Sequence, residues 1–455
     1  MSALVSGRVG QLRLAAGRHA VLLVNAGAMA AGTLATAVLG FVYWWLAARS
    51  FTPQAVGFAA AAISLMNLVA HLGEVGLGPY LMGELGRRPR AASLVSAALV
   101  AALAASAGLA LLSLLVARLL GVDLGAVAGG PGAEALFVAG CALTALTLVL
   151  DQAFIGLLRG GLQLSRNVVF AAVKLLLLAA LALAAGQGAD EAELYATWVL
   201  GQGASIALVA GLLAWSGQEV LHRPALPLLR PVLGQVAGHH ALSVAIQAPG
   251  LLLPFVVATT LSAEVNAAFY CAWTLLNVVL LVPASLSAVM VAVGVRDPGL
   301  VAARLRLSLL LSTLAGMGAG LAFLAFSPEI LGLFSPAYPG IAGTSLAYLG
   351  FGALGLMVKY HYLAIQRLRG RLGPASAVLA AGAMAELAAA ILGGRAGTLL
   401  DLTQAWLVAV LAQGLLLAPP VLAAARRGVV AATPAAAPSF EQPEPASRQA
   451  GPALS

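Results

Sequence analysis

Charged residues are scarce in this chain, at 9% of its 455 residues, whereas 61% are hydrophobic. This balance excludes a soluble globular core. The chain holds only two cysteines, Cys141 and Cys271, and both fall inside apolar stretches, which indicates neither a disulfide framework nor a zinc site. Loops longer than about 25 residues are also missing, so the sequence leaves no room for a soluble catalytic domain.

Long apolar stretches take up most of the chain. A helix needs about 20 apolar residues to cross a bilayer core of about 30 Å, and each stretch is long enough to do so. The sequence therefore predicts an all-α polytopic membrane protein with twelve transmembrane helices, over residues 20–43, 55–81, 92–117, 133–157, 167–186, 194–214, 236–260, 264–293, 304–326, 341–365, 375–393 and 400–425.

Arginine indicates how these helices are oriented. Nineteen arginines lie in alternate segments between the apolar stretches or at the chain ends, and only Arg49, Arg118 and Arg395 lie in the others. Because cytoplasmic loops carry the excess of Lys and Arg, we expect both termini in the cytoplasm of a cell-membrane protein. The basic residues 1–19 are predicted to precede a retained first helix, since a secretory signal has a shorter apolar core.

A proline-rich connection divides the twelve helices equally. We expect an N-terminal lobe over 20–214, a cytoplasmic linker over 215–235 and a C-terminal lobe over 236–425, followed by a disordered cytoplasmic tail over 426–455. Both lobes would begin on the cytoplasmic side, so they could be parallel repeats with a substrate site at their interface. The basic residues are spread over seven segments rather than gathered on one face, which excludes nucleic acid as a partner.

The chain has only two lysines, and both lie within apolar stretches. Asp151 lies in the apolar stretch before that of Lys174, and Glu386 lies in the stretch after that of Lys359. A charge at the bilayer centre is costly, so such residues usually face a cavity or a partner. Each lysine is expected to pair with the acid of its own hairpin, to snorkel to the cytoplasmic surface, or to face a central cavity and attract an anionic headgroup.

His71 and Glu74 lie three residues apart within the second stretch. This spacing puts them on one helical face, where they could form a proton-sensitive pair or make ordinary hydrogen bonds between helices. No cluster with metal-ligand spacing is present in the sequence, and no cofactor is expected.

Several short motifs resemble those of a known family. They include Gly40-Phe41-Val42-Tyr43, Ala47-Ala48-Arg49 and Phe51-Thr52-Pro53, then Gly73-Glu74-Val75-Gly76-Leu77-Gly78, and Gly156-Leu157-Leu158-Arg159-Gly160. Residues 20–175 resemble the polysaccharide-export flippases of the multidrug/oligosaccharidyl-lipid/polysaccharide (MOP) exporter superfamily. Elsewhere the resemblance rests on the number and spacing of the apolar stretches.

The resemblance implies two six-helix lobes that form a V around a cavity. It also implies a flippase, not an enzyme, that moves an isoprenoid-(pyro)phosphate-linked oligosaccharide from the cytoplasmic to the outer leaflet. Arg49 and Arg159 match family positions and join Lys174 and Lys359 as candidate headgroup contacts. Expected partners are the glycan substrate, membrane lipids and a polysaccharide polymerase or glycosyltransferases.

Two other functions stay open at this point. A cation-coupled multidrug exporter of the same superfamily would use acids such as Asp151 and Glu74 for protonation or sodium binding. An integral-membrane glycosyltransferase or ligase would need carboxylates in a sizeable outer loop, and the outer segments offer acids only in short loops.

Overall fold

The structure is a computed structural model of the chain, and it describes residues 32, 35–85, 91–121, 127, 129–217, 220–294, 299 and 301–428. These residues are almost entirely helical. Eleven of their helices are long and apolar enough to cross a membrane, and an additional helical segment over 35–50 corresponds to the end of the first predicted span. The predicted segment 1–19, much of the first span and most of the tail 426–455 lie outside the described residues.

The N-terminal lobe holds the first half of the helices. After the segment 35–50, its elements are α2 (Pro53–Gly73), α3 (Leu77–Glu84), α4 (Ala91–Leu120), α5 (Pro131–Gly156), α6 (Gly160–Ala184), η3 (Gly186–Gly188) and α7 (Glu191–Ser216). Local sequence sets several of the helix starts. Thr52 caps α2 ahead of a proline in its first turn, and Asp190 forms a capping box with Glu193 at the start of α7.

A connection containing η4 (Leu226–Val232) leads into the C-terminal lobe. Its elements are α8 (Leu233–Thr260), α9 (Ala263–Gly294), α10 (Val301–Gly332), α11 (Tyr338–Leu368), α12 (Leu372–Gly394) and α13 (Leu399–Arg427). α11 packs at the centre of this lobe, against α9, α10 and α13, and α12 packs against α8 and α13. The helices bear out the predicted all-α architecture.

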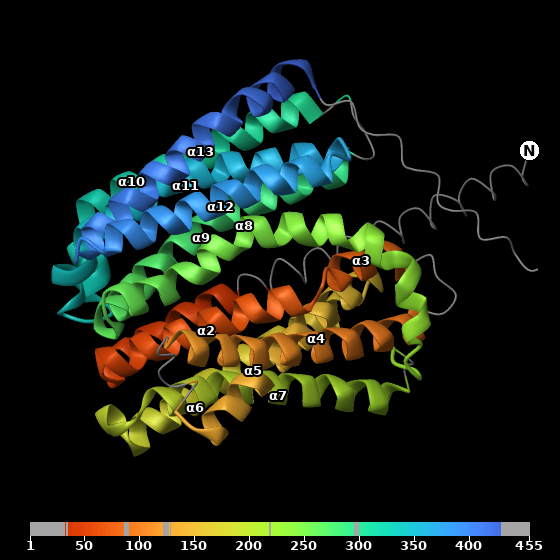
Figure 1. The fold of residues 1–455 in the computed structure, drawn as a ribbon, viewed down its shortest axis with the longest axis horizontal. Helices are drawn as coiled ribbons and strands as arrows, with labels where there is room; N and C mark the ends of the chain where they lie inside the picture. The colour runs from red at the N-terminus through yellow and green to blue at the C-terminus, as the bar shows by residue number, and fades with distance from the viewer. Residues whose placement is uncertain are drawn as a thin grey trace, which may run out of the picture.

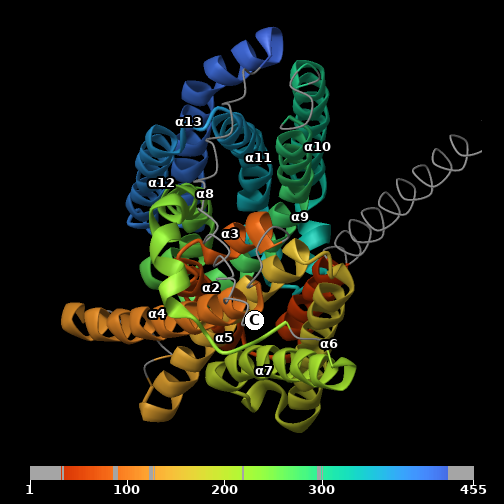
Figure 2. The ribbon, with the colours of Figure 1, turned by 90° about the vertical axis from the view of Figure 1, so that its right-hand side faces the viewer.

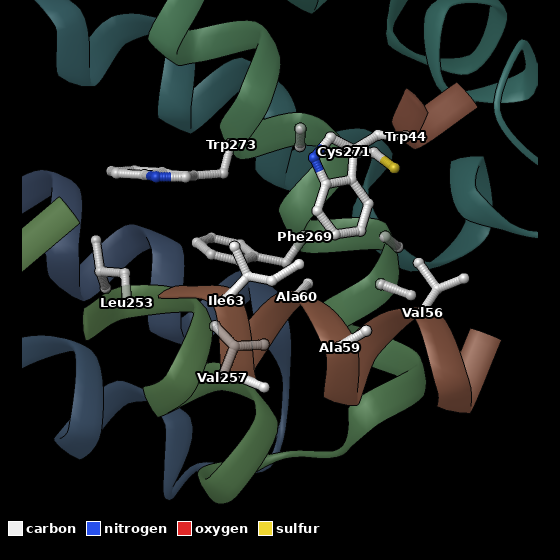
Figure 3. Close-up of a cluster of buried hydrophobic side chains, with 14 of the residues drawn as sticks. Trp44, Val56, Ala59, Ala60, Ile63, Leu253, Val257, Phe269, Cys271 and Trp273 are labelled. Carbon is white, nitrogen blue, oxygen red and sulfur yellow. The ribbon is translucent and has the colours of Figure 1, made fainter. Parts of the chain in front are cut away.

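The two lobes form separate bundles that meet along a few helices (Figures 1 and 2). In Figure 2, α2, α3, α8 and α9 lie between the bundle of α4–α7 and the bundle of α10–α13. α2 packs against both α8 and α9. Figure 3 shows Ile63 of α2 close to Phe269 of α9 and Leu253 of α8, in a buried apolar cluster that joins the lobes.

Small residues allow this close packing. The carbonyl oxygen of Ala263 lies so near Gly57 that a Cβ there would come within 1.7 Å of it. The side-chain amide of Asn266 donates a hydrogen bond to the Gly57 carbonyl at 2.7 Å. Nearby, the rings of Phe41 and Phe334 meet edge to face with centroids 5.1 Å apart. The lobes are therefore in direct contact at the end of the molecule where α2 begins.

The second predicted span, 55–81, is not one helix. α2 ends at Gly73 and α3 begins at Leu77, and between them Val75 and Gly76 have φ of 49° and 69°. This left-handed conformation suits glycine and is strained for a β-branched valine. The α carbon of Gly76 faces α8, because a Cβ there would lie 2.7 Å from Val236 and 2.8 Å from His240. The glycine-rich motif is thus a helix break that lets the other lobe approach.

Candidate functional site: a cavity between the lobes

A cavity of about 190 Å³ lies where the lobes meet. α2 of the N-terminal lobe contributes Ser64 and Asn67, and α8, α9, α11, α12 and α13 of the C-terminal lobe form the other walls. Two kinds of side chain dominate this wall besides aliphatic ones. They are aromatic rings (Tyr270, Trp273, Tyr360 and Trp406) and carboxamides (Asn67, Gln247 and Asn277).

Lys359 and Glu386 are the charged residues on the described part of this wall. Their side chains form an ion pair between α11 and α12, and each side chain is only 1% exposed. The positive charge of Lys359 and the negative charge of Glu386 thus neutralise each other within the cavity wall. The expected pairing of Lys359 with the acid of its own hairpin is confirmed. Lys359 also lines the cavity, and its contact with a headgroup stays a prediction.

An unpaired donor lies on the same wall. Trp406 of α13 is 1% exposed, and its indole Nε1 has no hydrogen-bond partner among the residues that the structure describes. Its ring meets that of Trp273 edge to face, with centroids 5.6 Å apart. An unpaired buried N–H costs free energy, so this indole would be stabilised by any acceptor that reached it.

Lys174 is held differently from Lys359. Its Nζ lies 3.4 Å from the ring centroid of Trp198, 4.5 Å from that of Phe170 and 5.1 Å from that of Tyr43. These are cation–π distances. The side chain is buried, and within the described part of the chain no carboxylate pairs with it.

Aromatic rings separate Lys174 from the cavity. The ring of Trp198 packs near that of Trp44, at 6.2 Å, and Trp44 packs against Tyr270 of the cavity wall at 4.5 Å. Lys174 is not among the residues that line the cavity. It lies behind this ring cluster, in the N-terminal lobe.

The pairing of Lys174 with Asp151 is wrong. Asp151 instead accepts two hydrogen bonds from the Arg166 guanidinium, from Nε at 2.7 Å and from Nη2 at 2.6 Å. The sequence-based prediction started the fifth span at 167, whereas α6 begins at Gly160. Lys174 therefore lies about 21 Å along its helix from the turn, and Asp151 only about 8 Å, at 1.5 Å per residue.

The two candidate arginines lie away from the cavity wall. Arg49 donates from Nε to the carbonyl oxygen of Leu333, at 2.9 Å, and its guanidinium lies 5.0 Å from the ring centroid of Trp45. It therefore bridges the lobes at the end where α2 begins. Arg159 lies in the turn before α6, and its buried Nη1 has no partner among the described residues. Neither lines the cavity.

His71 and Glu74 do not form a pair. Glu74 is buried at the end of α2, where the helix breaks, and no hydrogen bond or ion pair joins it to His71 in the described structure. The Glu74 carboxylate instead lies beside Gln152 and Gly78. His71 lies near His240 of α8.

Sequence reasoning missed most of the cavity wall. The three carboxamides lie on α2, α8 and α9, so no spacing along the chain groups them. The aromatic residues of the wall resembled ordinary helix-packing residues. Arg166 was counted only as one of the positively charged loop residues, although its distance from the turn matches that of Asp151 on the other side.

No family model and no curated protein matches the sequence. Solved structures are nevertheless similar. An inward-facing multidrug resistance MATE family transporter of the MOP superfamily aligns with a TM-score of 0.63 and 14% identity, over 88% of this chain and 96% of that one. An outward-facing one gives a TM-score of 0.63 at 14% identity, over 90% and 95%. The chain has the fold of MOP-superfamily transporters.

A third similar structure is of a protein described by the polarity of its own binding pocket. It is a MOP superfamily transporter from Pyrococcus furiosus, described by a reverse polarity of its binding pocket that suggests a different function. It aligns with a TM-score of 0.60 and 15% identity, over 90% of this chain and 96% of that one. With its long apolar helices, the chain is thus a multi-pass membrane protein with a transporter fold.

Proposed function

We propose that this chain is a membrane transporter that moves an isoprenoid-(pyro)phosphate-linked oligosaccharide to the outer leaflet of the cell membrane by alternating access. The observation that carries the proposal is the composition of the inter-lobe cavity wall, which combines the Lys359 ammonium with carboxamides and aromatic rings. The transporter fold favours transport over a membrane glycosyltransferase or ligase.

Each part of such a cargo has a matching group on the wall. Phosphate oxygens accept hydrogen bonds from an ammonium and from an indole N–H, which Lys359 and Trp406 supply. Sugar hydroxyls both donate and accept, as do the carboxamides of Asn67, Gln247 and Asn277. The lipid tail can stay in the bilayer, since many residues of the helix surfaces are exposed and apolar.

Lys174, Arg49 and Arg159 are further candidate contacts in this proposal. Lys174 reaches the cargo only in a state in which the rings of Trp44 or Trp198 move, because they separate it from the cavity. Arg49 and Arg159 would contact a headgroup outside the cavity, before or after transport. A polysaccharide polymerase or glycosyltransferases would be the partners that supply or consume the glycan.

Translocation in vesicles tests the function. Purified protein is reconstituted with a fluorescent isoprenoid-diphosphate-linked oligosaccharide, and movement between leaflets is followed by quenching with an impermeant reductant. We expect Lys359→Met to lower the initial rate about tenfold, because a hydrogen bond to a charged group is worth about 1.5–3 kcal/mol. Arg118→Met serves as a control, because that arginine is 62% exposed and does not line the cavity. Absence of protein-dependent movement in the wild type would refute the proposal.

A cation-coupled multidrug exporter is the second candidate. Glu386 is the carboxylate on the described cavity wall, and aromatic rings around it could hold an organic cation. The similar structures from multidrug resistance transporters are compatible with this function. Ethidium efflux from the same vesicles, lost in Glu386→Gln, together with an immobile glycan lipid, would favour the exporter.

A further inference from the structure

The ion pair in the cavity wall presents an obstacle to an anionic cargo. Lys359 already has a partner, Glu386, and both side chains are 1% exposed. An anion that binds to the Lys359 ammonium must replace the Glu386 carboxylate. That replacement would leave a carboxylate unpaired in a buried site, which is strongly unfavourable.

Protonation removes this cost. A buried carboxylate without a partner takes up a proton rather than stay charged. We propose that an anionic group of the cargo replaces Glu386 at the Lys359 ammonium and that Glu386 takes up one proton in the same step. The inference rests on the proposed function, since it takes an anionic cargo to bind in this cavity.

The step is balanced in charge and in bonds. A hydrogen bond from Lys359 Nζ to Glu386 Oε1 breaks and one from Nζ to a cargo oxygen forms. The Glu386 carboxylate gains a proton from the aqueous solution, and no electrons are transferred. One negative charge and one proton enter together, so a monoanionic group would leave the net charge of the cavity unchanged. Release of the cargo reverses both changes and frees the proton.

The surroundings of Glu386 leave few other groups that could take the proton. α12 packs against α8, α11 and α13. Over the described part of the cavity wall, α8 contributes Gln247 but no ionisable group, α13 contributes Trp406, and α11 contributes Lys359 and Tyr360. Tyr270 of α9 is the remaining ionisable group there. Because phenols are neutral at pH 7, Glu386 is the group on this wall that can accept the proton.

Calorimetry can count the proton. Purified protein in detergent is titrated with farnesyl diphosphate, a short isoprenoid diphosphate, at a pH at which the free diphosphate is fully ionised. Runs in two buffers with different ionisation enthalpies give the protons taken up per bound ligand. We expect about one for the wild type and none for Glu386→Gln. Linkage then makes the wild-type affinity fall about tenfold per unit rise in pH, whereas that of Glu386→Gln stays nearly constant.

Two further variants control for folding and for broken ion pairs. Lys359→Gln combined with Glu386→Gln leaves no buried charge and should unfold at or above the wild-type temperature without binding the diphosphate. Asp151→Asn breaks the pair of Asp151 with Arg166, which lies off the cavity wall, and should keep the wild-type proton count.

The outcomes separate the two proposals. Diphosphate binding to the wild type without proton uptake, or equal uptake by Glu386→Gln, would overturn the exchange at Lys359 and leave the proposed cargo standing. Wild-type affinity in the double variant would also overturn the exchange. A folded wild type that binds neither farnesyl diphosphate nor the glycan lipid would overturn both.

Discussion

Asp151 and Arg166 show how a buried ion pair can be structural. The pair joins α5 to α6, and its side chains are 17% and 5% exposed. Arg166 also approaches Gln202 of α7, with its Nη1 3.5 Å from the amide oxygen, so one guanidinium links three helices of the N-terminal lobe. The charges of Asp151 and Arg166 thus neutralise each other within this lobe, away from the cavity.

Breaking this pair should destabilise the protein. Asp151→Asn leaves the Arg166 charge buried and without its partner, and removing one member of such a pair costs about 3–5 kcal/mol. Thermal unfolding in detergent measures the loss. Asp151→Asn combined with Arg166→Gln should unfold at a higher temperature than Asp151→Asn alone, because no unpaired charge remains. Equal melting temperatures for the single and double variants would rule out a stabilising pair.

We expect the burial of the Lys174 ammonium to lower the stability of the folded protein. Its ammonium has only aromatic partners in the described structure, and cation–π contacts return about 2 kcal/mol when desolvated, less than the usual penalty for a buried charge. Lys174→Met, which keeps the length of the side chain, should therefore raise the melting temperature. If Lys174 contacts the cargo during transport, the same variant translocates the glycan lipid more slowly. A more stable variant with a wild-type rate would make the lysine dispensable for transport.

At the level of elements, the sequence predicted helices well and their ends less well. Long apolar runs locate α4 to α13, because any stretch of that length must form its backbone hydrogen bonds internally in lipid. The start of α6 was placed seven residues late, since Arg166 was taken for a loop residue, and this shift produced the wrong partner for Asp151. The break at Gly76 was missed because the apolar pattern continues through it.

The break between α2 and α3 offers a prediction with a matched control. Gly76→Ala adds a Cβ that would lie within 3 Å of both Val236 and His240, as well as strain from a φ of 69°. Gly121 has nearly the same φ, 65°, but nothing lies within 4 Å of its Cβ position. Gly121→Ala therefore measures the backbone strain alone. We expect Gly76→Ala to lower stability by about 1–3 kcal/mol more than Gly121→Ala, since overpacking a close contact costs that much.

This comparison is measured by thermal unfolding and by glycan translocation of both variants. The added methyl group pushes α8 of the other lobe away, so translocation should slow in Gly76→Ala and not in Gly121→Ala. Equal effects in the two variants would show that the approach of α8 to the break is unimportant.

At the level of the whole molecule, the orientation in the membrane is still a prediction from arginine. Cysteine labelling from outside the cell should reach position 190 and not position 370, and the reverse pattern would overturn the topology. The native Cys141 and Cys271 are buried, which limits their background reaction. This orientation would place the contact between Arg49 and Leu333 on the outer side.

The contact between the lobes at that end should have to open during alternating access. Phe41 and Phe334 come from different lobes and have ring centroids 5.1 Å apart. Cysteines at these two positions should be bridged by a short membrane-permeant bis-methanethiosulfonate, which forms a disulfide with each thiol and fills the space of the lost rings, in a background with both native cysteines replaced. The bridge should stop glycan translocation, and a reductant should restore it, because the lobes could no longer separate at this end.

A disulfide within one lobe provides the control for this experiment. The hydroxyls of Ser345 and Thr403 lie 3.2 Å apart between α11 and α13, and both residues are buried in the C-terminal lobe. Cysteines there should also cross-link, yet translocation should continue, since a rigid lobe can move as a unit. Continued translocation with Phe41→Cys and Phe334→Cys fully cross-linked would mean that this end stays closed throughout transport. Alternating access between these two lobes would then be excluded.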